Sequence, residues 1–202
     1  MKALLYKDFL VAKKYQRMFL VMDLFFLGMG IVGDVPFFLI LPLAMSSALV
    51  SSLVSYDERA RFDRTCDMLP VSRKTQVLEK YLLALLYVVP LFLLGCVGLV
   101  RHSAPGSQER ALMMLGMLSA GLLPTALILP PVFRVGMEKA RVFYYVFYFG
   151  GIALSGLAGS AAEEGGAVFS PAGLVPLAAL VLLLLYALSC LLSIRFYEQR
   201  EL

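Results

Sequence analysis

The ionisable side chains of this chain gather between Tyr56 and Tyr81, and their types favour binding over bond-making chemistry. Six basic and five acidic residues lie in this segment, with long apolar runs on both sides of it. A balance of opposite charges suits contact with a folded protein better than the purely basic clusters that bind anionic lipid. The sequence therefore predicts that this charged segment docks a partner protein.

Outside this segment, few residues have the type or spacing for chemistry. The single histidine and the three cysteines show no metal-ligand spacing, so the sequence predicts no metal site. It contains no G-x-x-x-x-G-K-[ST] loop to cradle ATP phosphates. We therefore expect no catalytic residue and no cofactor on this chain, and any ATP and Mg²⁺ to be bound by a separate subunit.

Asp23 is the only carboxylate well inside an apolar run. A charge there is costly, which makes a function within the membrane the default hypothesis. Two structural alternatives remain open, because Asp23 lies about a turn and a half beyond Arg17 at 3.6 residues per turn. The side chain could reach the interface or pair with a neighbouring helix.

The composition identifies the elements that must position these residues. Hydrophobic residues make up 60% of the chain and the mean hydropathy is +0.83, which predicts an all-α integral membrane protein. About 20 apolar residues span a bilayer, and we predict six spans in a single domain over 1–202: 18–33, 36–56, 81–100, 111–133, 142–162 and 174–194. The first span is short, and its close spacing to the second leaves a tight or partly re-entrant hairpin as the alternative.

The distribution of basic residues predicts the orientation. With six spans, 16 of the 18 Lys and Arg residues fall on one side, and only Arg101 and Arg110 lie opposite. Basic residues near spans stay in the cytoplasm. We therefore expect both termini on the cytoplasmic side of the membrane.

Two further segments are predicted to pack or lie along surfaces. Residues 1–17 form an amphipathic pattern that favours an interfacial helix, although Asp8 on the apolar half and Leu10 on the basic half interrupt it, and a plain topology-setting flank is the alternative. In the fifth span, Gly151, Ser155 and Gly159 recur at spacing four, which permits close helix approach. That face suits packing within one chain or contact between two copies of the chain equally well.

Within the charged segment, local signals predict a helix, a break and a second helix. The break is expected at Leu69-Pro70, because proline disfavours helical backbone at the preceding residue. Ser72 is placed to cap a helix that starts near Arg73 and continues into the third span. The first helix, around 57–68, would be a short cytoplasmic lever that passes the motion of a soluble partner into the membrane.

The sequence features Asp57-Glu58, Phe62, Leu69-Pro70-Val71-Ser72-Arg73 and Lys80-Tyr81 resemble the loop between the second and third spans of bacterial type 2 ABC exporter permeases. The resemblance extends to small Gram-positive members such as phenol-soluble-modulin and peptide exporter permeases. It implies that the cytoplasmic helix in segment 57–80 is a coupling helix seated on the ATP-binding subunit. The coupling residues would be Asp57, Glu58, Arg61, Phe62, Asp63, Arg64, Leu69, Pro70, Ser72 and Arg73.

The resemblance implies a permease subunit of an ATP-driven exporter in the bacterial cytoplasmic membrane, working with a second permease copy or paralogue. Amphipathic peptides or other hydrophobic molecules are the expected substrates, and nucleic acid is not an expected partner. The alternatives are the substrate-binding subunit of an energy-coupling-factor importer and an intramembrane enzyme. The importer subunit usually couples through small-residue helix faces, and the enzyme would need a nucleophile with a base, or a metal, within the bilayer.

Overall fold

The computed structural model describes residues 2–15, 17–33, 35–60, 62, 72–101, 106–143, 145–146 and 171–199. Every regular element in these ranges is helical, as the composition predicted. In chain order they are α1 (Lys2–Tyr15), α2 (Arg17–Val32), the short 3-10 helix η1 (Pro36–Leu39), α3 (Leu41–Arg59), α5 (Arg73–Arg101), α6 (Ser107–Val135) and α8 (Pro171–Glu198). Residues 137–143 are also helical.

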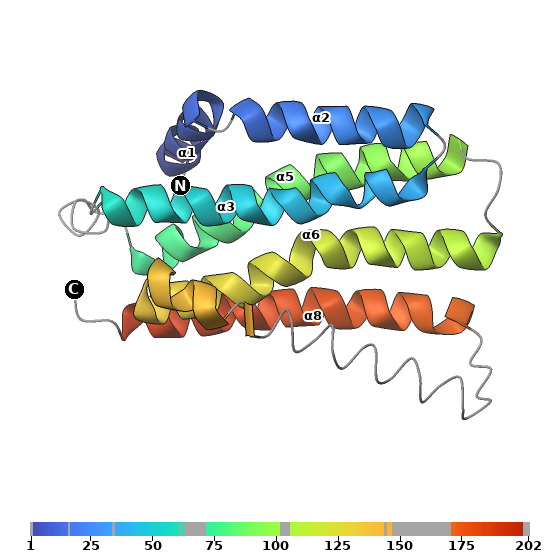
Figure 1. Cartoon of the computed structure of the whole chain (residues 1–202). Coiled ribbons are helices and arrows are strands. Elements are labelled where there is room, and N and C mark those ends of the chain that lie inside the picture. The colour runs from blue at the N-terminus through green and yellow to red at the C-terminus, as the bar shows by residue number, and fades with distance from the viewer. Residues whose placement is uncertain are drawn as a thin grey trace.

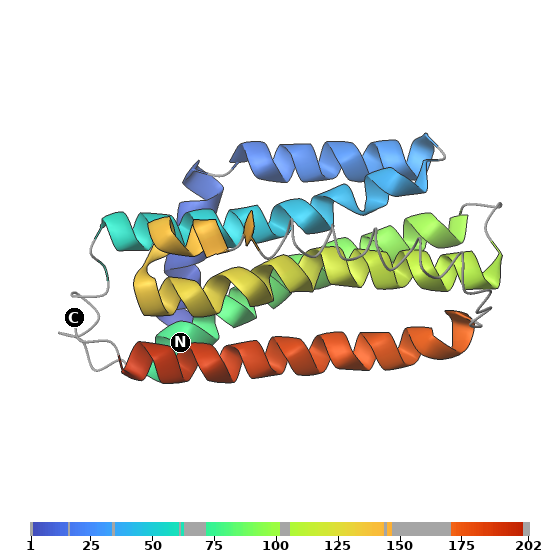
Figure 2. The same ribbon diagram turned by 60° about the horizontal axis from the view of Figure 1, so that its bottom comes forward.

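The long helices lie side by side in one bundle, and α1 crosses its end (Figure 1). Figure 2 shows the same arrangement from a second direction, with α8 along one edge of the bundle and α2 along the other. Helix α1, the C-terminal ends of α3 and α8 and the N-terminal end of α5 meet at one end of the bundle. We call this the basic end, because most Lys and Arg residues lie there.

Four helices in the described part of the chain are long and apolar enough to cross a membrane: Phe37–Arg59, Arg73–Arg101, Glu109–Val135 and Val175–Glu198. They coincide with the second, third, fourth and sixth predicted spans. Helix α2 qualifies only together with α1, from which it is bent by 77°. Most of the predicted fifth span lies outside the described residues, so the six-span arrangement stays a prediction. The described helices provide four candidate spans, or five if the bent pair forms one span.

The start of α5 follows its local sequence. The helix begins at Arg73, as predicted, and the backbone N–H of Thr75 donates to Ser72 Oγ at 3.3 Å. A side-chain oxygen that accepts from the first turn satisfies a donor that has no partner within the helix. The predicted cap at Ser72 is therefore confirmed.

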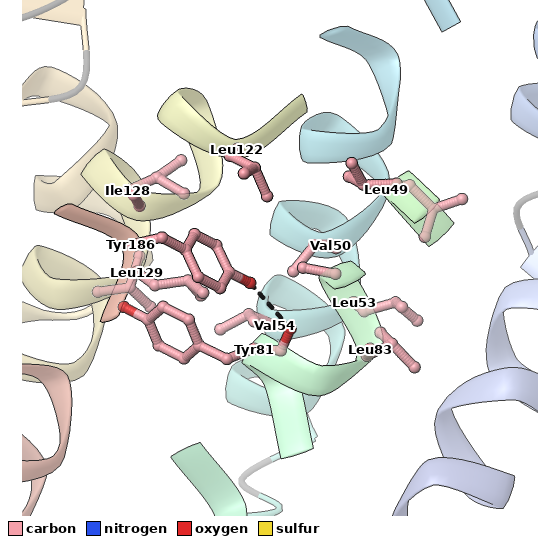
Figure 3. Packing of buried hydrophobic residues seen from close by; sticks show 14 of the residues in the cluster. Leu49, Val50, Leu53, Val54, Tyr81, Leu83, Leu122, Ile128, Leu129 and Tyr186 are labelled. Carbon is pink, nitrogen blue, oxygen red and sulfur yellow. Dashed lines mark hydrogen bonds between the residues drawn. The ribbon is translucent and has the colours of Figure 1, made fainter. Parts of the chain in front are cut away.

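The core is formed where α3, α5, α6 and α8 pack together (Figure 3). Leu53 of α3, Leu83 of α5 and Leu129 of α6 are fully buried there. Hydroxyl groups join the same helices, since Tyr186 Oη donates to the carbonyl of Tyr81 at 2.9 Å and Tyr81 Oη lies 2.7 Å from Ser189 Oγ. Hydrogen bonds between helices add to packing in a membrane, where apolar side chains gain little from leaving lipid.

Candidate functional site

Four charged side chains from three helices form a closed network at the basic end. Lys80 Nζ of α5 lies 2.5 Å from Asp8 Oδ2 of α1 and 2.5 Å from Asp57 Oδ2 of α3. Lys7 Nζ lies 2.7 Å from Asp57 Oδ1 and 2.9 Å from Asp8 Oδ1. Each carboxylate thus bridges both ammonium groups, and we call these four residues the ionic junction.

Burial strengthens the attraction between the charges at the centre of the ionic junction. The side chain of Asp8 is 1% exposed and that of Lys80 is 8% exposed, so water does not screen their attraction. Removing one partner of a buried pair leaves a charge with no compensation, which is far more costly than losing a surface pair. The junction therefore ties α1 to the ends of α3 and α5.

The packing face of α1 explains the acidic residue that interrupts its apolar half. Leu4, Asp8 and Ala12 are buried and recur every four residues, so they form one stripe that faces the bundle. Phe9 and Leu10 are exposed instead. Asp8 is thus the buried partner of Lys80 at the centre of the packed face, while exposed apolar residues remain available to the interface.

Phe62 extends the ionic junction toward the charged segment. Lys7 Nζ lies 3.8 Å from the centroid of the Phe62 ring, a distance typical of a cation–π contact. Phe62 had been predicted from the sequence to contact a partner. The structure shows that Lys7 contacts its ring.

Glu58 makes a second internal contact. Its Oε2 accepts the backbone N–H of Met137 at 2.9 Å, where the helical residues 137–143 begin. Gly136 precedes them with φ of +87°, a conformation that L residues rarely adopt, and a Cβ there would lie 2.6 Å from Glu58 Oε1. Glu58 therefore holds the turn after α6 against the end of α3.

A cavity of about 40 Å³ lies beside the ionic junction. Its wall includes Glu79 and Gln76 of α5, together with Tyr197 of α8, whose hydroxyl donates to Gln76 Oε1 at 2.8 Å. Glu79 Oε1 and Gln76 Nε2 are buried and have no hydrogen-bond partner among the described residues. The wall of this cavity therefore carries one unsatisfied acceptor and one unsatisfied donor.

Some of the predicted coupling residues lie in the described part of the chain, and the others lie outside it. Asp57 and Glu58 lie in the last turn of α3, which runs unbroken to Arg59, so they belong to the second span's helix and not to a separate short helix. Arg73 opens α5, with its guanidinium carbon 6.0 Å from the centroid of the Tyr197 ring. Phe62 and Ser72 are also described, with the contacts given above. The remaining predicted coupling residues lie outside the described part of the chain: Arg61, Asp63, Arg64, Leu69 and Pro70.

Asp23 lies on the packed face of α2. It forms a buried stripe with Leu27 and Gly30, and its side chain does not reach the exposed interface. Asp23 Oδ1 has no hydrogen-bond partner in the described part of the chain. The possible dimer-face residues Gly151, Ser155 and Gly159 lie outside that part.

The sequence interpretation did not assign site roles to Lys7, Asp8 or Lys80, which form the junction with Asp57. One signal pointed to them, since Asp8 interrupted an otherwise apolar face. A carboxylate on the packed face of a helix requires a buried cation, and Lys80 is that cation. The pairing itself depends on how α1 crosses α5.

The arrangement at the basic end is suited to transmitting movement. Among the described residues, no group of three or more His, Cys, Asp or Glu side chains is placed to hold a metal ion. The charges instead connect three helices and the turn after α6. The end of α3 is thereby joined to α1 and α5 through short ion pairs.

The family model described as "ABC-2 family transporter protein" matches residues 3–198. No curated protein and no solved structure shows a significant match. The matched range covers the helices described above, apart from Lys2 at the start of α1.

Proposed function

The chain belongs to the ABC-2 family of transporter proteins, and from this membership we propose that it is the permease subunit of an ATP-driven exporter. The observation that carries the proposal is the family match over residues 3–198, almost the whole chain. Family membership and the apolar helices make it a multi-pass membrane protein and an ABC transporter component. The match favours this proposal over the importer subunit and the intramembrane enzyme.

The energy would come from a separate ATP-binding subunit. The sequence has no loop that could cradle ATP phosphates, so this chain is proposed to be a non-enzymatic partner of the ATPase. The segment between α3 and α5 would be the docking point. The ionic junction supports this role, because it lies where that segment leaves α3 and links it to two further helices.

Co-purification with the ATP-binding subunit encoded beside this chain tests the proposal. We would reverse two charges in the docking segment, with Asp63→Lys and Arg64→Glu, and leave the junction and Glu58 intact. The matched control reverses two exposed charges at the opposite end, with Arg101→Glu and Glu109→Arg. We expect the wild type and the control to retain the ATPase and the docking variant to lose most of it.

Two results would count against the proposal. If the wild type does not co-purify with the ATPase, the proposal that a separate ATPase drives this chain is contradicted. If the docking variant retains as much ATPase as the control, the segment between α3 and α5 is not the docking point.

The transported molecules are proposed to be amphipathic peptides or other hydrophobic compounds, because the spans carry few charges that could stabilise a small ion. Two permease copies, or this chain with a paralogue, would enclose the path in the bacterial cytoplasmic membrane, with both termini in the cytoplasm. ATP-dependent uptake of a labelled amphipathic peptide by inside-out vesicles measures this activity. Equal uptake without ATP would contradict it.

Asp23 is proposed to take part in transport. The proposal is supported by the burial of the Asp23 carboxylate on the packed face of α2, where no described residue bonds to its Oδ1. Burying a carboxylate within a membrane span is costly, so such a residue is by default a candidate for function. We expect Asp23→Asn to reduce peptide uptake at least tenfold while expression stays normal. Unchanged uptake would leave Asp23 a structural residue.

A further inference from the structure

The ionic junction and its neighbour Glu79 do not balance in charge. Three carboxyl groups, of Asp8, Asp57 and Glu79, face the two ammonium groups of Lys7 and Lys80. The side chain of Glu79 is 2% exposed, so solvent does not stabilise an excess negative charge there. A buried charge without a partner is avoided by binding a cation or by taking a proton.

The geometry identifies which carboxyl group is left without a cation. Asp8 is bonded to Lys80 at 2.5 Å and to Lys7 at 2.9 Å, one ammonium on each oxygen. Asp57 is bridged in the same way. Glu79 Oε2 is 3.9 Å from Lys80 Nζ, which is beyond hydrogen-bond distance.

Glu79 and Asp8 are both buried beside the ammonium group of Lys80. Two ionised carboxylates buried beside one ammonium group repel each other, and the repulsion is removed when one of them takes a proton. Both oxygens of Asp8 already accept from ammonium groups, so Asp8 is the ionised member. The proton therefore belongs to Glu79.

The cavity accounts for the other oxygen of Glu79. Glu79 Oε1 and Gln76 Nε2 are unsatisfied among the described residues, and both residues line the cavity of about 40 Å³. One acceptor and one donor beside a space of that size match a bound water molecule. A metal ion does not match, because the carboxylate oxygens of Asp8 and Asp57 are occupied by ammonium groups and the described residues supply no metal-binding group.

Among the residues that the structure describes, the remaining helices at the cavity supply no further positive charge. From α3, Glu58 lines the cavity, and its Oε2 accepts a hydrogen bond from the backbone N–H of Met137. From α8, the Tyr197 hydroxyl is bonded to Gln76, and from α6 the wall residues are Val132 and Phe133. The cations that act on Glu79 are Lys80 and, further away, Lys7.

We infer that the α1–α5 contact is a proton-binding site, in which Glu79 carries one proton, donates it in a hydrogen bond to Asp8, and binds water in the cavity through its second oxygen. The proton is taken from water at the basic end when α1 packs on α5. When α1 separates, Glu79 loses Asp8 and becomes hydrated, and the proton returns to water. This inference rests on the geometry of the described residues and does not depend on the proposed function.

Infrared spectroscopy of the full chain in lipid nanodiscs at neutral pH tests the inference. The protein would be labelled with ¹³C at the glutamate side-chain carboxyl groups. We expect a C=O stretch of a protonated glutamic acid in the wild type, and its loss in Glu79→Gln, which preserves the shape of the side chain. Glu138→Gln is the matched control, because Glu138 is exposed and its removal leaves the band in place.

The inference is overturned if the wild type shows no protonated glutamate band, or if the band survives in Glu79→Gln. Should Glu79→Gln fail to fold, a pH titration of the wild type decides the question. The band must then persist to a pH well above the ordinary glutamate pKa of about 4.3, and its loss at or below that value excludes a proton held at neutral pH.

Thermal unfolding supplies an independent measurement. A folded state that keeps one proton more than the unfolded state loses stability as pH rises above the glutamate pKa of the unfolded chain, by about tenfold in the unfolding constant per pH unit, until the folded state also releases the proton. We expect this decline in the wild type and in Glu138→Gln, and a flatter profile in Glu79→Gln. Parallel profiles for all three proteins would contradict the inference.

Discussion

At the scale of single residues, the partners of a charge decide what it does. Lys74 and Lys80 both lie in the charged segment, yet the Lys74–Glu198 pair is solvated, with side chains 63% and 43% exposed, whereas Lys80 is 8% exposed between two carboxylates. An exposed ion pair adds little because water already solvates both groups. A buried one must stay complete, since either charge alone is costly.

We therefore predict different costs for two matched substitutions. Lys80→Met leaves Asp8 and Asp57 with an uncompensated buried charge and should lower the free energy of unfolding by about 3–5 kcal/mol. Lys74→Met removes only the exposed pair and should change it by about 0–1 kcal/mol. Denaturant unfolding in detergent micelles measures both, and equal effects would show that the ionic junction does not hold α1 in place.

At the scale of elements, small residues let the α2–η1 hairpin close against α5. Leu39 of η1 is fully buried, and a Cβ added at Gly30 of α2 would lie 2.5 Å from Leu39 Cδ2. At Gly98 of α5 the corresponding distance is 3.2 Å. The absence of side chains at both glycines thus creates the space that Leu39 fills.

This packing predicts how the size of the side chains at positions 39 and 30 affects the free energy of unfolding. Leu39→Ala should lower the free energy of unfolding by about 2–5 kcal/mol through the cavity it leaves, while Leu86→Ala, at a side chain 54% exposed on α5, should cost much less. Gly30→Ala should be destabilising alone but less so when combined with Leu39→Ala, because the smaller residue makes room. Additive effects of the pair would contradict the proposed contact.

At the scale of the whole molecule, the helices place most of the described basic residues at one end. The end of α3, the start of α5, α1 and the end of α8 lie there together (Figure 1), and the ionic junction joins α1, α3 and α5 at the same end. Basic residues are retained in the cytoplasm. The basic end is therefore expected to face the cytoplasm and the ATP-binding subunit.

Cysteine labelling checks this orientation. In a variant whose native cysteines are replaced, Lys13→Cys and Lys139→Cys should react with a membrane-impermeant maleimide only after the cells are opened. Glu109→Cys, at the opposite end, should react in intact cells. The reverse pattern would place the basic end outside and remove the proposed route to a cytoplasmic ATPase.

Local signals in the sequence determined much of the fold. The apolar runs overlap four helices that are long and apolar enough to cross a membrane, and Ser72 with the following residues predicted the start of α5. These features depend on hydropathy over about 20 residues and on capping within one turn, both of which are readable along the chain. The predicted first span, 18–33, was recognised as short, and in the structure α2 qualifies as a span only together with α1.

Only the tertiary structure decided which charges meet. Lys80 is 72 residues from Asp8 and 23 from Asp57, so no helical spacing relates them. Their contact depends on where α1, which is bent by 77° from α2, crosses the bundle. It also depends on the continuation of α3 through Asp57. Sequence patterns report the faces of each helix, whereas an ion pair between helices is fixed by the distances and angles at which those faces pack.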